Sequence, residues 1–186
     1  MRNDDSDIKI FNPSSKDDRD HDILNLVESI DHHRRNGNIL RARKLGQKLS
    51  EIAMEPETMD ELLAGGFESP EDITEAGVLL LFSTEAALNY FLPTTQLSAI
   101  AISSLHECLD ETKSEFFTNV VESPAYSFYY LSVRKGGEDV DRNIGEAFAM
   151  LCHHEGDETY IEKGKAIYNM ALHEVEKDVR NADFAE

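Results

Sequence analysis

The feature that most constrains the fold of this chain is an apolar stretch from Ile73 to Leu109. Its first part is apolar on most of its helical surface, and its second part carries apolar residues every third or fourth position, as α-helices do. Between the two parts, Pro93 cannot continue a helix, and Thr94 or Thr95 can cap the next one. We therefore expect two helices that fold back on each other. Because such helices must be buried on several sides, the other helices should pack around this apolar hairpin.

The apolar hairpin does not have the pattern of a membrane span. A span needs about 20 residues with few or no charges. Here Glu75 and Glu85 interrupt the first helix, and Glu107 and Asp110 end the second. Glycine and proline are sparse, few segments alternate as strands do, and a chain of 186 residues fits one domain. The sequence predicts an all-α domain of seven to eight helices in antiparallel pairs, with no membrane partner.

The organisation along the chain follows from composition and helix signals. Residues 1–19 predict a flexible acidic tail, residues 20–180 a single helical domain, and residues 181–186 a C-terminal tail. Besides the hairpin, helices are expected at residues 20–35, 39–54, 114–121, 123–136, 140–154 and 158–179, with a short helix and a loop in 57–70. Gly37 can take the left-handed conformation that closes a helix, and Ser69-Pro70 is a typical helix start.

The first two helices resemble a tetratricopeptide-type pair. In that family a glycine closes the first helix and an alanine follows five residues later, a spacing that Gly37 and Ala42 have here. Pro56 lies near the position of the family's terminal proline. Two positions depart from the family pattern, because Gly46 stands in place of a large aromatic residue and Leu26 in place of the tryptophan.

The C-terminal part shows self-similarity at an offset of nineteen residues. The pairs are Gly137 and Gly156, Gly145 and Gly164, and Ala147 and Ala166. The pattern resembles the stacked helices of tetratricopeptide-like and Sel1-like proteins, in which glycine and alanine let two helices approach closely. The alternative is that any regular helical hairpin gives such coincidences. The resemblance implies a helical-repeat fold and a binding function, and it implies no catalytic residue.

Charge is distributed unevenly along the chain. The formal net charge is −19, yet six cations cluster in residues 34–48, and residues 49–112 contain no lysine or arginine. Arg41, Lys44 and Lys48 share one helical face, which predicts a site for an acidic peptide or a phosphate. The alternative is that this basic helix and the acidic segment 51–75 screen each other. Nucleic acid is not an expected partner, because a body this acidic would repel a phosphate backbone.

An aromatic segment provides a second candidate site. Tyr126, Phe128, Tyr129 and Tyr130 cannot all face one core, so some of them must lie at a rim or groove. We predict that Tyr126, Tyr129 and Tyr130 line a groove that holds a peptide or another copy of the chain. The alternative is that these tyrosines pack in the core with their hydroxyls in water.

Metal-binding and cofactor patterns are weak in this sequence. His32-His33 and His153-His154 are adjacent pairs, and adjacent residues of a helix point about 100° apart, so each pair cannot easily share one ion. Glu28 and His32 lie on one helical face, but two ligands are a weak signal. The sequence has no His-Glu-x-x-His, Cys-x-x-Cys or phosphate-binding glycine motif. We expect no metal and no cofactor.

The two cysteines favour a structural interpretation. Cys108 and Cys152 lie in apolar helical stretches, which predicts small buried side chains and not a disulfide framework. Cys152 could serve as a nucleophile only with a base from elsewhere, because its neighbour His153 would point away from it. Free thiols and an acidic N-terminus without an apolar run indicate a cytoplasmic protein.

The sequence as a whole favours a non-enzymatic interaction module of helical-repeat type. Its expected partner is a protein, a peptide or a second copy of the chain. The alternative is a small helical enzyme or metal-binding protein that uses histidine, glutamate and aspartate side chains.

Overall fold

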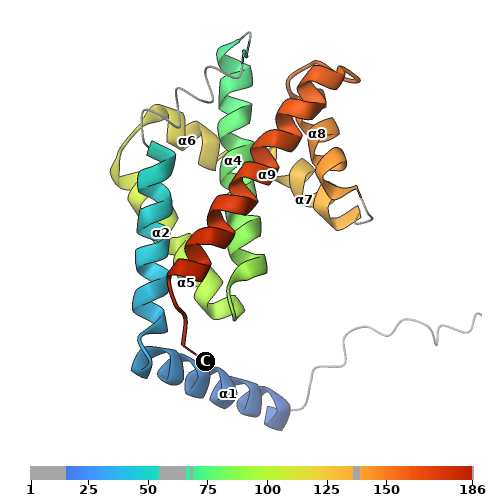
Figure 1. Cartoon of the computed structure of the whole chain (residues 1–186). Coiled ribbons are helices and arrows are strands. Elements are labelled where there is room, and N and C mark those ends of the chain that lie inside the picture. Colours follow the sequence, from blue (N-terminus) through green and yellow to red (C-terminus); the bar gives the residue numbers. More distant parts are fainter. Residues whose placement is uncertain (1–15, 55–65, 68, 136–138, 186) are drawn as a thin grey trace, which may run out of the picture. The chain divides into compact units, whose positions relative to one another are not determined.

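A computed structural model of the chain describes residues 16–54, 66–67, 69–135 and 139–185. Within these ranges the chain forms eight helices and no strand, which confirms the predicted all-α class. The helices are α1 (Lys16–Arg35), α2 (Asn38–Met54), α4 (Pro70–Phe91), α5 (Thr95–Glu111), α6 (Glu115–Val121), α7 (Tyr126–Lys135), α8 (Val140–Leu151) and α9 (Glu158–Asn181), labelled in Figure 1. The tail expected at residues 1–19 and the short helix expected in 57–70 lie largely outside the described residues. None of the described helices is both long enough and apolar enough to cross a membrane.

Contacts within the chain divide it into two units, residues 1–37 and residues 38–186. The described part of the first unit is α1 and the turn after it, where Gly37 has a φ of 80°, the left-handed conformation predicted for it. Leu24, Leu26 and Val27 of α1 are exposed. The antiparallel pairing of residues 20–35 with 39–54 and the single domain at 20–180 stay predictions.

Local capping interactions set where the helices of the second unit begin. Ser69 caps α4 by accepting a hydrogen bond from the backbone N–H of Asp72 at 3.1 Å, and Pro70 is the first helical residue. Thr94 caps α5 through the backbone N–H of Leu97 at 3.3 Å. Both starts agree with the sequence prediction, because a cap depends only on the few residues beside it.

Helix α4 is the centre of the second unit. It contacts α5, α6, α7, α8 and α9, and Val78, Leu79 and Leu88 are among its fully buried residues. The prediction that other helices pack around this helix is confirmed. The two helices of the apolar hairpin are not each other's main partners, however, because α4 packs most extensively on α9 and α5 on α2. Figure 1 shows α9 crossing α4, with α2 on the side away from α7 and α8.

Glycines determine how closely some of these helices approach. A Cβ atom at Gly46 of α2 would lie only 2.2 Å from the carbonyl oxygen of Ala101 in α5. A Cβ atom at Gly164 of α9 would lie 3.0 Å from the Cα atom of Gly145 in α8. The expected close approach of the two helices at Gly145 and Gly164 is thus confirmed. The two glycines are nineteen residues apart in the sequence because they face each other across one helical hairpin. A repeat of helical pairs, as in tetratricopeptide-like proteins, is not confirmed.

Two polar contacts connect the C-terminal end of the chain to α2. Lys48 Nζ donates to Asp178 Oδ1 of α9 at 2.6 Å, and the Asp178 side chain is buried. The side chain of Asn38 forms two hydrogen bonds with the backbone of Ala185, of 2.7 and 2.9 Å. Residues 182–185, which lie in the predicted C-terminal tail, therefore end against the beginning of α2.

Candidate functional site

Two of the predicted tyrosines line an open groove between α4 and α7, here called the tyrosine groove. Its described lining residues are Phe82, Glu85, Ala86 and Asn89 of α4 and Tyr126, Ser127, Tyr130, Leu131 and Val133 of α7. Its volume is about 640 Å³, within the range of roughly 300–1,000 Å³ that is typical of ligand sites. Most of the wall is apolar, so the groove can receive apolar side chains of a ligand.

Glu85 organises the polar end of the tyrosine groove. Its Oε1 accepts a hydrogen bond from the Tyr126 hydroxyl at 2.9 Å and lies 2.6 Å from Nε2 of His106 on α5. The hydrogen bond to Glu85 raises the pKa of His106 against the opposing effect of burial, whereas burial and the Glu85 charge both raise the pKa of Tyr126. Glu85 therefore keeps His106 charged to higher pH and holds Tyr126 in place as a neutral phenol.

Tyr129 lies in the core and does not line the groove. Its side chain is fully buried with its ring centroid 5.5 Å from that of Phe82, and its hydroxyl has no hydrogen-bond partner among the described residues. Burial raises the pKa of Tyr129, and the nearby Glu75 carboxylate raises it further. The structure thus separates the three predicted tyrosines: Tyr126 and Tyr130 lie at the groove, and Tyr129 packs inside.

A second groove, here called the acidic groove, lies between α7, α8 and the beginning of α9. Its volume is about 610 Å³, and its described lining residues are Phe128, Leu131, Ser132, Arg142, Asn143, Glu146, Ala147, Met150, Glu155, Gly156, Glu158 and Ile161. Apolar side chains from all three helices line it together with three glutamates. The only cation among these residues is Arg142, which donates to Glu146 at 3.1 Å and to Glu158 at 3.1 Å. The acidic groove therefore combines an apolar wall with negative charge.

Helix α7 separates the two grooves and exposes apolar side chains between them. Phe128, Tyr130 and Leu131 are 46%, 59% and 55% exposed, and Leu131 lines both grooves. These three side chains are here called the α7 apolar surface. Exposed apolar patches rimmed by polar residues are typical of interaction sites. The sequence analysis counts Phe128 among the aromatic residues that cannot all be buried, but it assigns only the tyrosines to a groove and does not consider Leu131.

The three cations predicted to form a site on α2 have different surroundings. Lys48 pairs with Asp178, and Arg41 is half-buried, with its Nη1 donating to the Asn38 side chain at 3.4 Å. Lys44 is exposed. Within the described part of the chain, the acid that Lys48 meets comes from α9 and not from the segment 51–75. Binding of an acidic ligand by this face stays a prediction.

Cys152 has the surroundings of a structural thiol. It is buried, and burial, aided by the negative charges of Asp72 and Glu75, raises the pKa of its thiol. A thiol with a raised pKa stays protonated and is a poor nucleophile. The prediction of a small buried side chain is confirmed for Cys152, whereas Cys108 is half-buried. Among the described residues, no group of three or more histidine, cysteine, aspartate or glutamate side chains is placed to hold a metal ion.

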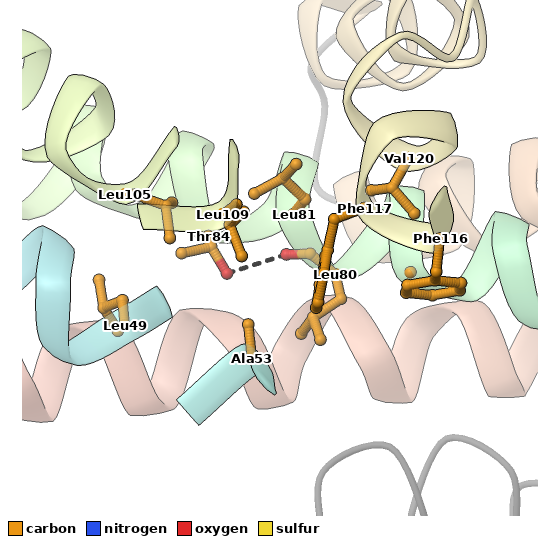
Figure 2. Close-up of a pocket in the computed structure, with 11 residues that line it drawn as sticks. Leu49, Ala53, Leu80, Leu81, Thr84, Leu105, Leu109, Phe116, Phe117 and Val120 are labelled. Atoms are coloured by element: carbon orange, nitrogen blue, oxygen red, sulfur yellow. Dashed lines mark hydrogen bonds between the residues drawn. The ribbon is translucent and has the colours of Figure 1, made fainter. Parts of the chain in front are cut away.

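A small apolar cavity lies between α2, α4, α5 and α6 (Figure 2). Its volume is about 30 Å³, and Leu49, Leu105 and Phe116 are among its lining residues. The hydroxyl of Thr84 at this cavity is bonded to the backbone oxygen of Leu80 at 2.9 Å. A space of this size holds about one water molecule. We interpret the cavity as a packing gap and not as a ligand site.

Comparison of the chain with protein-family models, with curated proteins and with solved structures finds no significant match. The functional hypothesis therefore depends on the grooves and surfaces described above.

Proposed function

We propose that this protein is a non-enzymatic interaction module that binds a peptide segment of a partner protein on helix α7. The observation that carries this proposal is the α7 apolar surface, Phe128, Tyr130 and Leu131, which is exposed between two grooves of about 610 and about 640 Å³. Aromatic residues next to pockets are the typical anchors of protein interfaces. The grooves can take apolar side chains of the ligand on both sides of the helix.

The local arrangement around α7 fits a helical module. Helix α7 packs on α8 and α8 packs on α9, as consecutive helices do in repeat proteins. The proposal includes a helical-repeat type of binding and a cytoplasmic location, both of which the sequence predicts. The alternative, a small helical enzyme or metal-binding protein, has less support because Cys152 is buried and Glu85 is already engaged by two side chains.

A selection experiment tests the proposed function. Peptides of about 16 residues, a length of four helical turns, are selected from a displayed random library on the wild-type protein. Their affinities are then measured for Phe128→Ser/Leu131→Ser and for the matched surface variant Arg43→Gln/Lys44→Gln. Both residues of each pair are exposed, so thermal unfolding should show that both variants remain folded.

We expect the α7 variant to bind the selected peptides about tenfold or more weakly, because the loss of an interface anchor has an effect of this size. The α2 variant should bind them with nearly unchanged affinity. The reverse pattern would refute the proposal and favour the basic face of α2. A dimer that is present in sedimentation experiments and is lost in the α7 variant would also refute it, because the occupant would then be a second copy of the chain.

A further inference from the structure

We infer that the acidic groove receives an amphipathic helix of a partner protein that carries lysine or arginine beside its apolar face. This inference rests on the proposed function, because it names the class of ligand that the α7 surface binds. It depends on the shape, the apolar wall and the charge of the groove.

The helical form of the ligand follows from the fold. The described part of the chain contains no strand, so an extended peptide finds no sheet edge there to which it could add. The walls of the groove are instead two neighbouring helices that contact each other, α7 and α8. Phe128 and Leu131 lie three residues apart on α7, and Ala147 and Met150 lie three apart on α8, so each wall is one face of a helix. A third helix can pack its apolar face between two such walls.

The apolar part of the groove is open to a ligand. Phe128 and Leu131 are about half exposed and Met150 is 38% exposed, whereas Ile161 beside them is buried. Methionine is flexible and adapts to different apolar partners, which suits a surface that receives side chains of a ligand. The groove therefore offers apolar surface that a ligand helix would remove from water.

The basic character of the ligand follows from the charges of the groove. Its described lining has three carboxylates and one guanidinium, which leaves a net charge of −2. The guanidinium of Arg142 is shared by Glu146 and Glu158, whose side chains are still 53% and 62% exposed. Glu155 is exposed and lies on the same groove. Lysine or arginine side chains of a ligand can pair with these carboxylates, whereas acidic side chains would be repelled.

Two synthetic peptides test this inference. Both have about 18 residues, five helical turns, with leucines on one face. One carries lysine and arginine on the flanking positions, here called the basic peptide, and its acidic twin carries glutamate there. Affinities are measured by fluorescence anisotropy for the wild type, for Glu146→Gln/Glu155→Gln, and for Leu131→Ser. The control is Glu51→Gln/Glu111→Gln, which removes the same charge from exposed positions on α2 and α5.

We expect the basic peptide to bind about tenfold or more tightly than its twin in low salt, and to lose most of that preference in about 500 mM salt, where charges are screened. Glu146→Gln/Glu155→Gln should weaken the basic peptide by about fivefold or more, the control by less than about twofold, and Leu131→Ser should weaken both peptides. If the control and the groove variant lose equal affinity for the basic peptide, the inference is overturned, because the attraction would then come from the overall charge of the protein.

The outcomes separate this inference from the proposed function. If both peptides bind equally and Leu131→Ser weakens both, the basic ligand is wrong and the α7 site stands. If neither peptide responds to Leu131→Ser, the inference and the α7 site both fail.

Discussion

Glu85 uses one carboxylate oxygen to hold side chains from two other helices, His106 of α5 and Tyr126 of α7. The contact joins the tyrosine groove to a hollow between α5 and α6, where His106 lies with Asp110 and Glu122. A change in the charge of His106 therefore acts on the residue that positions Tyr126. Protonation is the change that ordinary pH can produce there, because histidine titrates near neutral pH.

The pH dependence of stability should report the His106–Glu85 contact. The pKa of His106 is raised in the folded protein, so the stability that the contact contributes is fully present below the unfolded value of about 6.5 and is lost as pH rises through the folded pKa. We expect His106→Gln to lower the free energy of unfolding by less than about 1 kcal/mol at pH near 6, because both side chains are partly exposed. Near pH 8.5 the free energies of unfolding of the wild type and the variant should differ less. Urea unfolding of both proteins at the two pH values measures this difference.

The glutamate offers a control for this prediction. Glu85→Gln removes the carboxylate whose hydrogen bond and charge raise the pKa of His106. The pH profile of its stability should therefore be flattened in the same window as that of His106→Gln. If the wild type exceeds His106→Gln in free energy of unfolding by more at pH 8.5 than at pH 6, the contact does not favour the charged histidine.

The sequence predicts only part of the site at this scale. It indicates that the aromatic residues of segment 126–130 cannot all be buried, but it does not indicate which of them face the core. That choice depends on how α7 is rotated on α4, where Phe82 contacts both Tyr126 and Tyr129. The sequence does not indicate the contact of Glu85 with His106 either, because it joins two helices and no periodic pattern relates the two residues.

At the scale of helices, glycine allows two helix pairs, α2 with α5 and α8 with α9, to approach each other closely. At Gly46 the obstacle to a side chain is the backbone of α5, and the Ser104 hydroxyl on α5 donates to the carbonyl of Arg43 on α2 at 3.1 Å. At Gly77 of α4 the obstacle is the end of the Phe116 ring, 2.7 Å away. A backbone obstacle requires two helices to separate, whereas a ring at the end of a side chain can turn aside.

This difference predicts unequal effects of the same substitution. We expect Gly46→Ala to lower the free energy of unfolding by about 2–3 kcal/mol, because the added methyl group forces α2 away from α5. Gly77→Ala should cost less than about 1 kcal/mol, because the gain in helix propensity offsets the shift of Phe116. Chemical denaturation of the two variants and the wild type gives both values. Equal costs, or a larger cost at Gly77, would contradict the assigned role of Gly46.

Helix positions were easier to predict than helix partners. The starts at Ser69-Pro70 and after Thr94 depend on neighbouring residues and were confirmed. The pairing of α5 with α2 and of α4 with α9 joins segments distant in the sequence. The close approach of α5 to α2 depends on Gly46. In the resemblance to tetratricopeptide-type units, Gly46 was a departure from the pattern, and the structure gives it a role in packing.

At the scale of the second unit, the cluster of cations on α2 and the acidic groove lie on different sides of the central helix α4. Helix α2, which carries the cations, lies on one side of α4, and helices α7 and α8 lie on the other (Figure 1). The acidic groove is located at α7 and α8. The sequence shows the clustering of charge but not this arrangement. Glu146, Glu155 and Glu158 are unremarkable along the chain, and they form one site only because α8 and α9 fold back on each other.

Mapping of amide chemical shifts during a titration with the basic peptide tests most directly whether ligands bind at α7. The binding site proposed here predicts that the largest shifts fall in α7, α8 and the first turns of α9, and that Arg43 and Lys44 on α2 are nearly unaffected. Largest shifts on α2, or equally small shifts over the whole chain, would contradict it.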